Sequence, residues 1–235
     1  MSEKIWLFGD SYADQNNNND PNSWVRRLQR LGYDIDNFAV AGSGPEYQLS
    51  LFYNQMNTTS STKLKEINLI FLISACNRIN FSFLNPRDQI IKPKITFFKF
   101  KPSKMELEIL EKYPNYMNFL EDFYRYYFMH NNNSSMLIEK NVGLLSLYKD
   151  QFKSILAWPI FDSVNRAFSY TDTFCVPSLR MYEIDTEESE QESQENIRAN
   201  HMRPHVHEEL ANQIERWIMR GKKINIHKFN LLRNK

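Results

Sequence analysis

The chain has 235 residues, of which 42% are hydrophobic, so it can form a substantial buried core. Its 29 basic and 28 acidic residues nearly cancel, which argues against a dedicated nucleic-acid or membrane-surface binder. The two cysteines, Cys76 and Cys175, form no CxxC pattern, which excludes a disulfide framework and a thiolate metal site. The apolar part of the N-terminus is too short for a signal peptide, and no apolar stretch approaches the ~20 residues that span a bilayer. We therefore expect a cytoplasmic protein.

Four short segments are predicted to be strands. In chain order they are residues 5–8, 35–40, 67–73 and 155–158. The first and the third are continuous apolar runs, which is typical of strands buried on both faces of a parallel sheet. The first run ends abruptly in a small polar turn, Gly9-Asp10-Ser11.

Amphipathic helical segments separate these strands. Asp20-Pro21 can cap and begin the first helix, and Gly32 is expected to end it. A second helix begins near Glu46. The last begins near Pro204, ends at Gly221 and has a buried apolar stripe of Val206, Leu210, Ile214, Trp217 and Ile218. Short strands that alternate with such helices predict βαβ units and a parallel sheet, so the fold class is α/β.

Residues 80–150 interrupt this alternation and are predicted to be an insertion packed over one edge of the sheet. Residues 92–104 interleave lysines with phenylalanines, and residues 113–130 have a helical period with many aromatic side chains. Another helix is predicted to lead into the fourth strand, so we expect an insertion that is mostly helical and rich in aromatic residues. Further along the chain, the acidic residues 183–196 are expected to be a mobile loop, and residues 221–235 form a basic tail.

Polar residues follow three of the predicted strands, at the ends where open parallel sheets bind their ligands. Ser11 follows the first strand, Gly42 the second and Asn77 the third, while His201 lies in the loop before the last helix. A serine becomes a nucleophile at neutral pH when a base accepts its proton, and Ser11 and His201 can form that pair. The oxyanion needs positioned donors, which the Ser11 and Gly42 N–H groups and the Asn77 amide can supply. We interpret Asp10 as structural, holding the turn by accepting backbone N–H bonds.

Four blocks of the sequence resemble, in order, the blocks of the SGNH hydrolases, also called GDSL-type esterases. They are GDS at 9–11, NFAVAGSG at 37–44, ACNR at 75–78 and NHMRPHVHEELA at 200–211. The resemblance implies one domain over residues 1–220, with a three-layer α/β/α fold around a short, flavodoxin-like parallel sheet. It also implies a serine esterase or acylhydrolase that cleaves a small-molecule, glycan or lipid ester, O-acetyl esters included, without a cofactor or a metal.

The resemblance also implies a role for each matching residue. Ser11 matches the nucleophile and His201 the catalytic histidine. Ser11, Gly42 and Asn77 match the three donors of the oxyanion hole.

The chain departs from the family at Arg198, which stands where an Asp generally orients the catalytic histidine. An arginine side chain only donates hydrogen bonds, so it cannot accept the proton of an imidazole N–H. Glu195, Asp162 or a backbone carbonyl are alternatives for orienting His201.

A catalytically degenerate protein of the same fold is the alternative function. It would act as a binding module for a glycan or a polyanion, held by the lysines and aromatic residues of 92–104 and by the basic tail. The commoner explanation of 92–104 is an amphipathic strand or hairpin that buries its phenylalanines and leaves its lysines in water. Taken singly, each of the four blocks also fits an ordinary turn or helix cap. The near-zero net charge argues against nucleic acid as the partner.

A zinc site formed by His201, His205 and His207 is a further alternative. Two histidines four residues apart share a face only when both lie in one helix. Because Pro204 disfavours helical geometry in the residue before it, His201 is expected to lie outside the helix, and we expect no metal.

Overall fold

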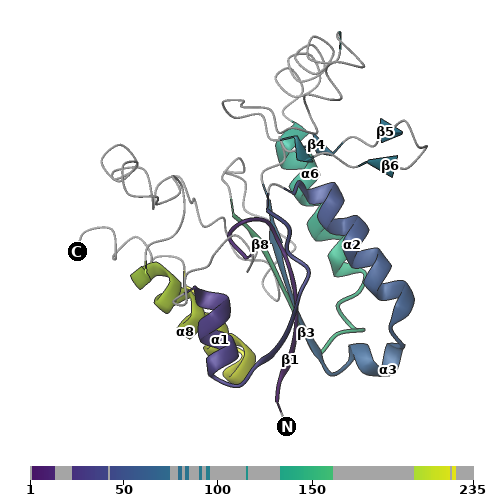
Figure 1. The fold of residues 1–235 in the computed structure, drawn as a ribbon. Helices are drawn as coiled ribbons and strands as arrows, with labels where there is room; N and C mark the ends of the chain where they lie inside the picture. Colours follow the sequence, from purple (N-terminus) through teal and green to yellow (C-terminus); the bar gives the residue numbers. More distant parts are fainter. Residues whose placement is uncertain are drawn as a thin grey trace, which may run out of the picture.

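The computed structural model describes residues 2–13, 23–41, 43–74, 79–80, 83–84, 90–91, 94–95, 115, 133–160, 204–222 and 224–225. In this part of the chain, a four-stranded parallel sheet is packed against helices, which is an α/β fold (Figure 1). The predicted fold class is confirmed. The predicted acidic loop at 183–196 lies outside the described residues, as does the predicted helix at 113–130 apart from Asn115.

The sheet contains all four predicted strands. They are β1 (Lys4–Phe8), β2 (Asp34–Asn37), β3 (Ile67–Ile73) and β8 (Ser154–Pro159), in the spatial order β2-β1-β3-β8 with every pair parallel. The second strand is shorter than predicted because the Asn37 side chain turns the backbone, its Oδ1 accepting the Ala39 N–H at 2.9 Å. Beyond this turn the chain still follows β1, where the Phe38 N–H donates to the Leu7 carbonyl at 2.8 Å.

Four of the five described helices fall in predicted segments, one of them with a corrected start, and the short helix at 61–64 was not predicted. They are α1 (Trp24–Arg30), α2 (Pro45–Thr58), α3 (Ser61–Leu64), α6 (Asn133–Ser146) and α8 (Pro204–Arg220). Gly32 and Gly221 follow α1 and α8 with φ of 92° and 60°, which confirms both as helix ends. The predicted cap at Asp20-Pro21 is wrong, because Ser23 is the N-cap of α1 and its hydroxyl accepts the Arg26 N–H.

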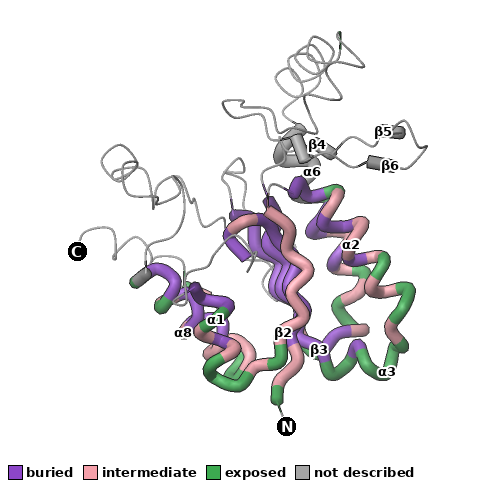
Figure 2. Tube along the Cα trace, in the orientation of Figure 1, coloured by how far each residue is buried: buried purple, intermediate pink, exposed green. Residues whose placement is uncertain are grey.

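The central strands bury side chains on both faces, because successive residues of a strand point to opposite sides. The strand residues on one face pack against α1 and α8. These residues are Ile5, Leu7, Ile70, Leu72, Leu156 and Trp158. The strand residues on the other face pack against α2 and α6. They are Trp6, Phe8, Ile67, Leu69, Phe71, Ile73, Ile155 and Ala157. Figure 2 shows these strands buried between helices whose outer surfaces are exposed.

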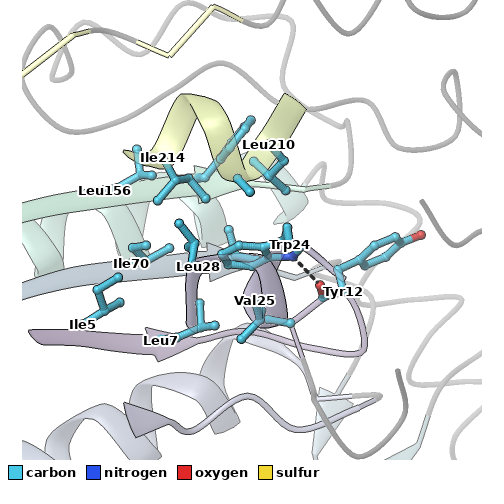
Figure 3. Packing of buried hydrophobic residues seen from close by; sticks show 14 of the residues in the cluster. Ile5, Leu7, Tyr12, Trp24, Val25, Leu28, Ile70, Leu156, Leu210 and Ile214 are labelled. Carbon is cyan, nitrogen blue, oxygen red and sulfur yellow. Dashed lines mark hydrogen bonds between the residues drawn. The ribbon is translucent and has the colours of Figure 1, made fainter. Parts of the chain in front are cut away.

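The predicted apolar stripe of α8 is confirmed. Val206, Leu210 and Ile214 are buried in the cluster that α1 and α8 form with the sheet, and Trp217 and Ile218 pack against it partly buried. Figure 3 shows Leu210 and Ile214 lying over the sheet, close to Trp24 of α1.

The opposite face of the sheet is dominated by aromatic rings. Phe52 of α2 lies at its centre, with its ring centroid 5.7 Å from that of Phe8, 5.4 Å from Tyr148 and 6.1 Å from Phe152. Such edge-to-face and tilted contacts are favourable beyond the area that they bury. They hold α2 firmly on the face beside β1.

Ion pairs join the strands at the amino edge of the sheet. Lys4 of β1 contacts Asp34 at 2.8 Å and Asp36 at 2.9 Å, both on β2. Glu3 pairs with Lys153, just before β8, and this hydrogen bond lowers the pKa of the Glu3 carboxyl against the opposing effect of its partial burial. These groups are partly exposed, so each pair contributes little to stability.

The described part of the predicted insertion includes short extended segments. β4 (Ile79–Asn80) pairs with β7 (Lys94–Ile95), and β5 (Phe83–Leu84) pairs with β6 (Ile90–Ile91), both antiparallel. Sequence reasoning missed β4, β5 and β6, because two residues are too few to show a strand period. β7 lies within 92–104, where an amphipathic strand or hairpin is the ordinary interpretation of the sequence. The helix expected before the fourth strand is α6. Within the described residues, no helix is both long enough and apolar enough to cross a membrane.

We predict that adjacent residues of β3 are equally intolerant of truncation. Ile70→Ala and Phe71→Ala each remove a buried side chain, on opposite faces, and should lower the free energy of unfolding by about 2–5 kcal/mol. The exposed control Met219→Ala should change it by less than about 0.5 kcal/mol. Urea denaturation measures all three, and a mild effect at either strand position would contradict burial of both faces.

Candidate functional site

The candidate site lies at the carboxyl edge of the sheet, between β1 and β3. The order β2-β1-β3 means that the chain leaves β1 for one neighbour and later crosses to the other. The helix after β1 packs on one face and the helix after β2 packs on the other (Figure 1). This is the topological switch point at which open α/β sheets bind ligands.

Gly9 allows the turn after β1 to pack closely on β3. A Cβ atom at this position would lie 3.1 Å from the Ala13 Cβ and 3.2 Å from the Leu72 Cβ, closer than nearly all real contacts of this kind. The Gly9 carbonyl also accepts the Val40 N–H and the Ser43 hydroxyl, each at 3.0 Å. Gly9 therefore joins the turn after β1 to the loop after β2.

Asp10 is fully buried and holds the turn from within. Its Oδ1 accepts the Tyr12 N–H at 3.1 Å, and its backbone carbonyl accepts the Ala13 N–H at 3.0 Å. Its Oδ2 accepts the Ser74 hydroxyl at 2.8 Å, directly after β3. The interpretation of Asp10 as a structural residue that accepts backbone N–H bonds is confirmed. The bond to Ser74, which ties two strand ends together, was not anticipated.

Ser11 is half-buried and lies between two well-held residues of this turn. Asp10 before it is anchored to β3, and Tyr12 after it donates its N–H to Asp10 and accepts the indole N–H of Trp24 at 2.8 Å. Figure 3 shows this last bond. The structure thus places Ser11 at the switch point, on a backbone held from both sides.

The other predicted site residues lie outside the described part of the chain. They are Gly42, Asn77 and His201. Arg198 and the two carboxylates considered for orienting His201, Glu195 and Asp162, also lie outside it. Described residues near two of them, Gly42 and Asn77, nevertheless hydrogen-bond to the turn after β1. Ser43 hydrogen-bonds to Gly9, and Ser74, three residues before Asn77 in the chain, hydrogen-bonds to Asp10.

A buried histidine anchors the start of α8 to the start of α1. The His207 Nδ1 accepts the Trp24 N–H at 3.3 Å, so the neutral ring carries its proton on Nε2. Trp24 in turn donates to Tyr12, next to Ser11. Sequence reasoning missed this role, although His207 lies at helical spacing from Leu210, Ala211 and Ile214 and so falls on the buried face.

Of the three histidines in the zinc alternative, His205 and His207 are described, and their positions do not support a shared metal site. His205 is exposed and His207 is buried with Nδ1 occupied by a hydrogen bond, so the two rings belong to different surroundings. Within the described residues, no group of three His, Cys, Asp or Glu side chains converges as metal ligands would.

Three buried polar side chains complete the carboxyl edge. Gln48 of α2 donates from Nε2 to the Ser43 hydroxyl at 3.3 Å, and its Oε1 accepts the Ser74 N–H at 3.4 Å. The exposed fractions of Ser43, Gln48 and Ser74 are 0%, 1% and 1%. Gln48 shares its helix face with the buried Leu49 and Phe52, and a polar residue on such a face was the available signal.

A scan of the sequence against models of known protein families found no match, and a search of curated proteins found none either.

We predict that Asp10 stabilises the fold far more than a surface aspartate does. Asp10→Ala leaves the buried Ser74 hydroxyl and the Tyr12 N–H without this acceptor, and should lower the free energy of unfolding by at least about 1–3 kcal/mol. Asp34→Ala on the neighbouring strand removes an exposed carboxylate and should cost less than about 1 kcal/mol. Equal effects in chemical denaturation would show that the buried carboxyl group does not hold the turn.

Proposed function

We propose that this protein is a serine esterase or acylhydrolase of the SGNH type, with Ser11 as its nucleophile. The observation that carries the proposal is the position of Ser11. It directly follows a fully buried, hydrogen-bonded Asp10, at the carboxyl end of β1 and at the switch point with β3. Ligands bind at this point in open parallel sheets, and a nucleophile needs a rigid support there.

In the proposed reaction, the Ser11 hydroxyl attacks the carbonyl carbon of an ester while His201 accepts its proton. The N–H groups of Ser11 and Gly42 and the Asn77 amide stabilise the oxyanion. The intermediate collapses to an acyl-serine as His201 returns the proton to the leaving alcohol. A water molecule, deprotonated by His201, then attacks the acyl group, and the proton returns to Ser11 as the acid leaves.

The described neighbours of these residues support their convergence. Ser43, next to Gly42, donates a hydrogen bond to the Gly9 carbonyl. Ser74, three residues before Asn77, donates one to the Asp10 carboxylate. The start of α8 follows His201 by three residues and is linked through His207 and Trp24 to the Ser11 turn. A described residue near each proposed catalytic residue is therefore hydrogen-bonded, directly or through Trp24, to the turn that contains Ser11 or to Gly9 before it.

We further propose that the whole domain, residues 1–220, has the three-layer arrangement of the SGNH hydrolases. The order β2-β1-β3-β8 is the flavodoxin-like order as far as it is described, and helices pack on both faces. The insertion at about 80–150 would shape the pocket for the acyl or alcohol group. The substrate class is an ester of a small molecule, a glycan or a lipid.

We predict that purified protein hydrolyses short-chain aryl esters and is labelled on Ser11 by a fluorophosphonate probe. Ser11→Ala should abolish both without unfolding the chain, because Ser11 is only half-buried. Ser50→Ala on α2 is the control and should behave as wild type. Mass spectrometry of the labelled peptide identifies the site. Wild-type protein that is inert to the probe and to a panel of esters would instead favour a binding module for a glycan or a polyanion.

We predict a Ser–His dyad in which Arg198 does not take part. His201→Gln should abolish activity by removing the base, whereas Arg198→Ala should leave it intact or raise it, since a cation disfavours protonation of a nearby imidazole. Arg198→Asp should raise turnover by supplying an acceptor for the imidazole N–H. Esterase rates against pH test the three variants. Activity retained in His201→Gln, or lost in Arg198→Ala, would mean that the site is organised differently.

A further inference from the structure

The hydrogen bonds of the carboxyl edge form a closed ring. The Gly9 carbonyl accepts the Ser43 hydroxyl, which accepts the Gln48 Nε2–H, and the Gln48 Oε1 accepts the Ser74 N–H. The Ser74 hydroxyl then donates to Asp10, the residue bonded to Gly9 in the chain. The ring therefore joins the end of β1, the loop after β2, the first turns of α2 and the end of β3.

Gln48 bridges the loop after β2 and the end of β3 through the two ends of one amide group. An amide has both a donor and an acceptor in fixed geometry, and here the donor faces Ser43 while the acceptor faces the Ser74 N–H. Neither a carboxylate nor an apolar side chain of the same size can make both bonds. The amide is 1% exposed, so water does not replace a lost bond cheaply.

We propose that Gln48 is a positioning residue for the oxyanion hole, an inference that rests on the proposed function. The three proposed donors belong to Ser11, Gly42 and Asn77, which are on three separate segments. The ring holds Ser43, directly after Gly42, and Ser74, shortly before Asn77, against the residues that precede Ser11. Oxyanion donors act by being correctly placed before the charge develops. Relative motion of the segments that hold them therefore weakens stabilisation of the transition state.

A positioning role and a merely structural role predict different kinetics. Loss of oxyanion geometry lowers kcat and leaves KM nearly unchanged, because the interaction is made in the transition state. It also leaves the pH profile unchanged, because the base is not involved. A structural role lowers the melting temperature and the fraction of active enzyme, without a change in kcat per labelled active site.

The test compares Gln48→Met with Gln55→Met, a matched control two turns further along α2. With active sites counted by fluorophosphonate titration, Gln48→Met should lower kcat at least about tenfold, less than the roughly 10²–10³ lost with a whole donor. Its KM should stay within about twofold of wild type. A kcat per active site equal to that of Gln55→Met would overturn the proposal. If Gln48→Met does not fold, Ser43→Ala breaks the same ring with a smaller change and should show the same pattern.

A double-mutant cycle with Asn77→Ala tests the route of the effect. If Gln48 acts by placing the oxyanion donors, Gln48→Met should lower kcat much less in the Asn77→Ala background than in wild type. Additive losses would overturn the proposal, since Gln48 would then act independently of the donor.

Amide hydrogen exchange distinguishes failure of this inference from failure of the proposed function. In Gln48→Met, peptides that contain Ser43 and Ser74 should exchange faster than in Gln55→Met, while peptides of α8 should not change. Wild-type protein without esterase activity would overturn both the proposed function and the positioning role of Gln48 in it. Unchanged exchange in an active enzyme would overturn the positioning role alone.

Discussion

The buried carboxyl group of Asp10 is the constraint on which the carboxyl edge depends. A polar group can be taken out of water without a large loss of stability only if its hydrogen bonds are replaced, and here Tyr12 and Ser74 replace them. The turn therefore folds back over Asp10 and lies against β3, where a Cβ atom at position 9 would crowd Ala13 and Leu72. The bond from Ser74 to Asp10 joins the ends of β1 and β3, and Ser11 follows directly in the turn that Asp10 holds.

The two edges of the sheet are held by different interactions. At the amino edge, Lys4 and Lys153 pair with carboxylates that remain partly exposed, so these bonds are weak and are screened by salt. At the carboxyl edge, Asp10, Gln48 and Ser74 are buried. Loss of one hydrogen bond there leaves a buried polar group unsatisfied, because water does not reach it to replace the bond. The proposed chemistry takes place at the carboxyl edge, and catalysis by preorganised donors needs support of this buried, hydrogen-bonded kind.

The sequence predicted the site only in part. Ser11 and Asp10 stood out because a polar turn follows an apolar run, and Asp10 indeed accepts a backbone N–H from its own turn. Gln48 and the anchoring role of His207 were missed, although each residue lies on the buried face of its helix. Periodicity shows that such a residue is buried, but it does not show which distant group will satisfy it.

The sequence by itself determined the strands, most helix ends and the α/β class, because these depend on residues within a few positions of one another. β3 and the start of α8 coincide with their predictions for that reason. Only the tertiary structure decided that β1 lies between β2 and β3, and which polar groups meet there. Asp10 and Ser74 are 64 residues apart, and Trp24 and His207 are 183 apart. No local pattern contains such a pairing, since it arises only when strand order and helix packing bring distant segments to the same buried place.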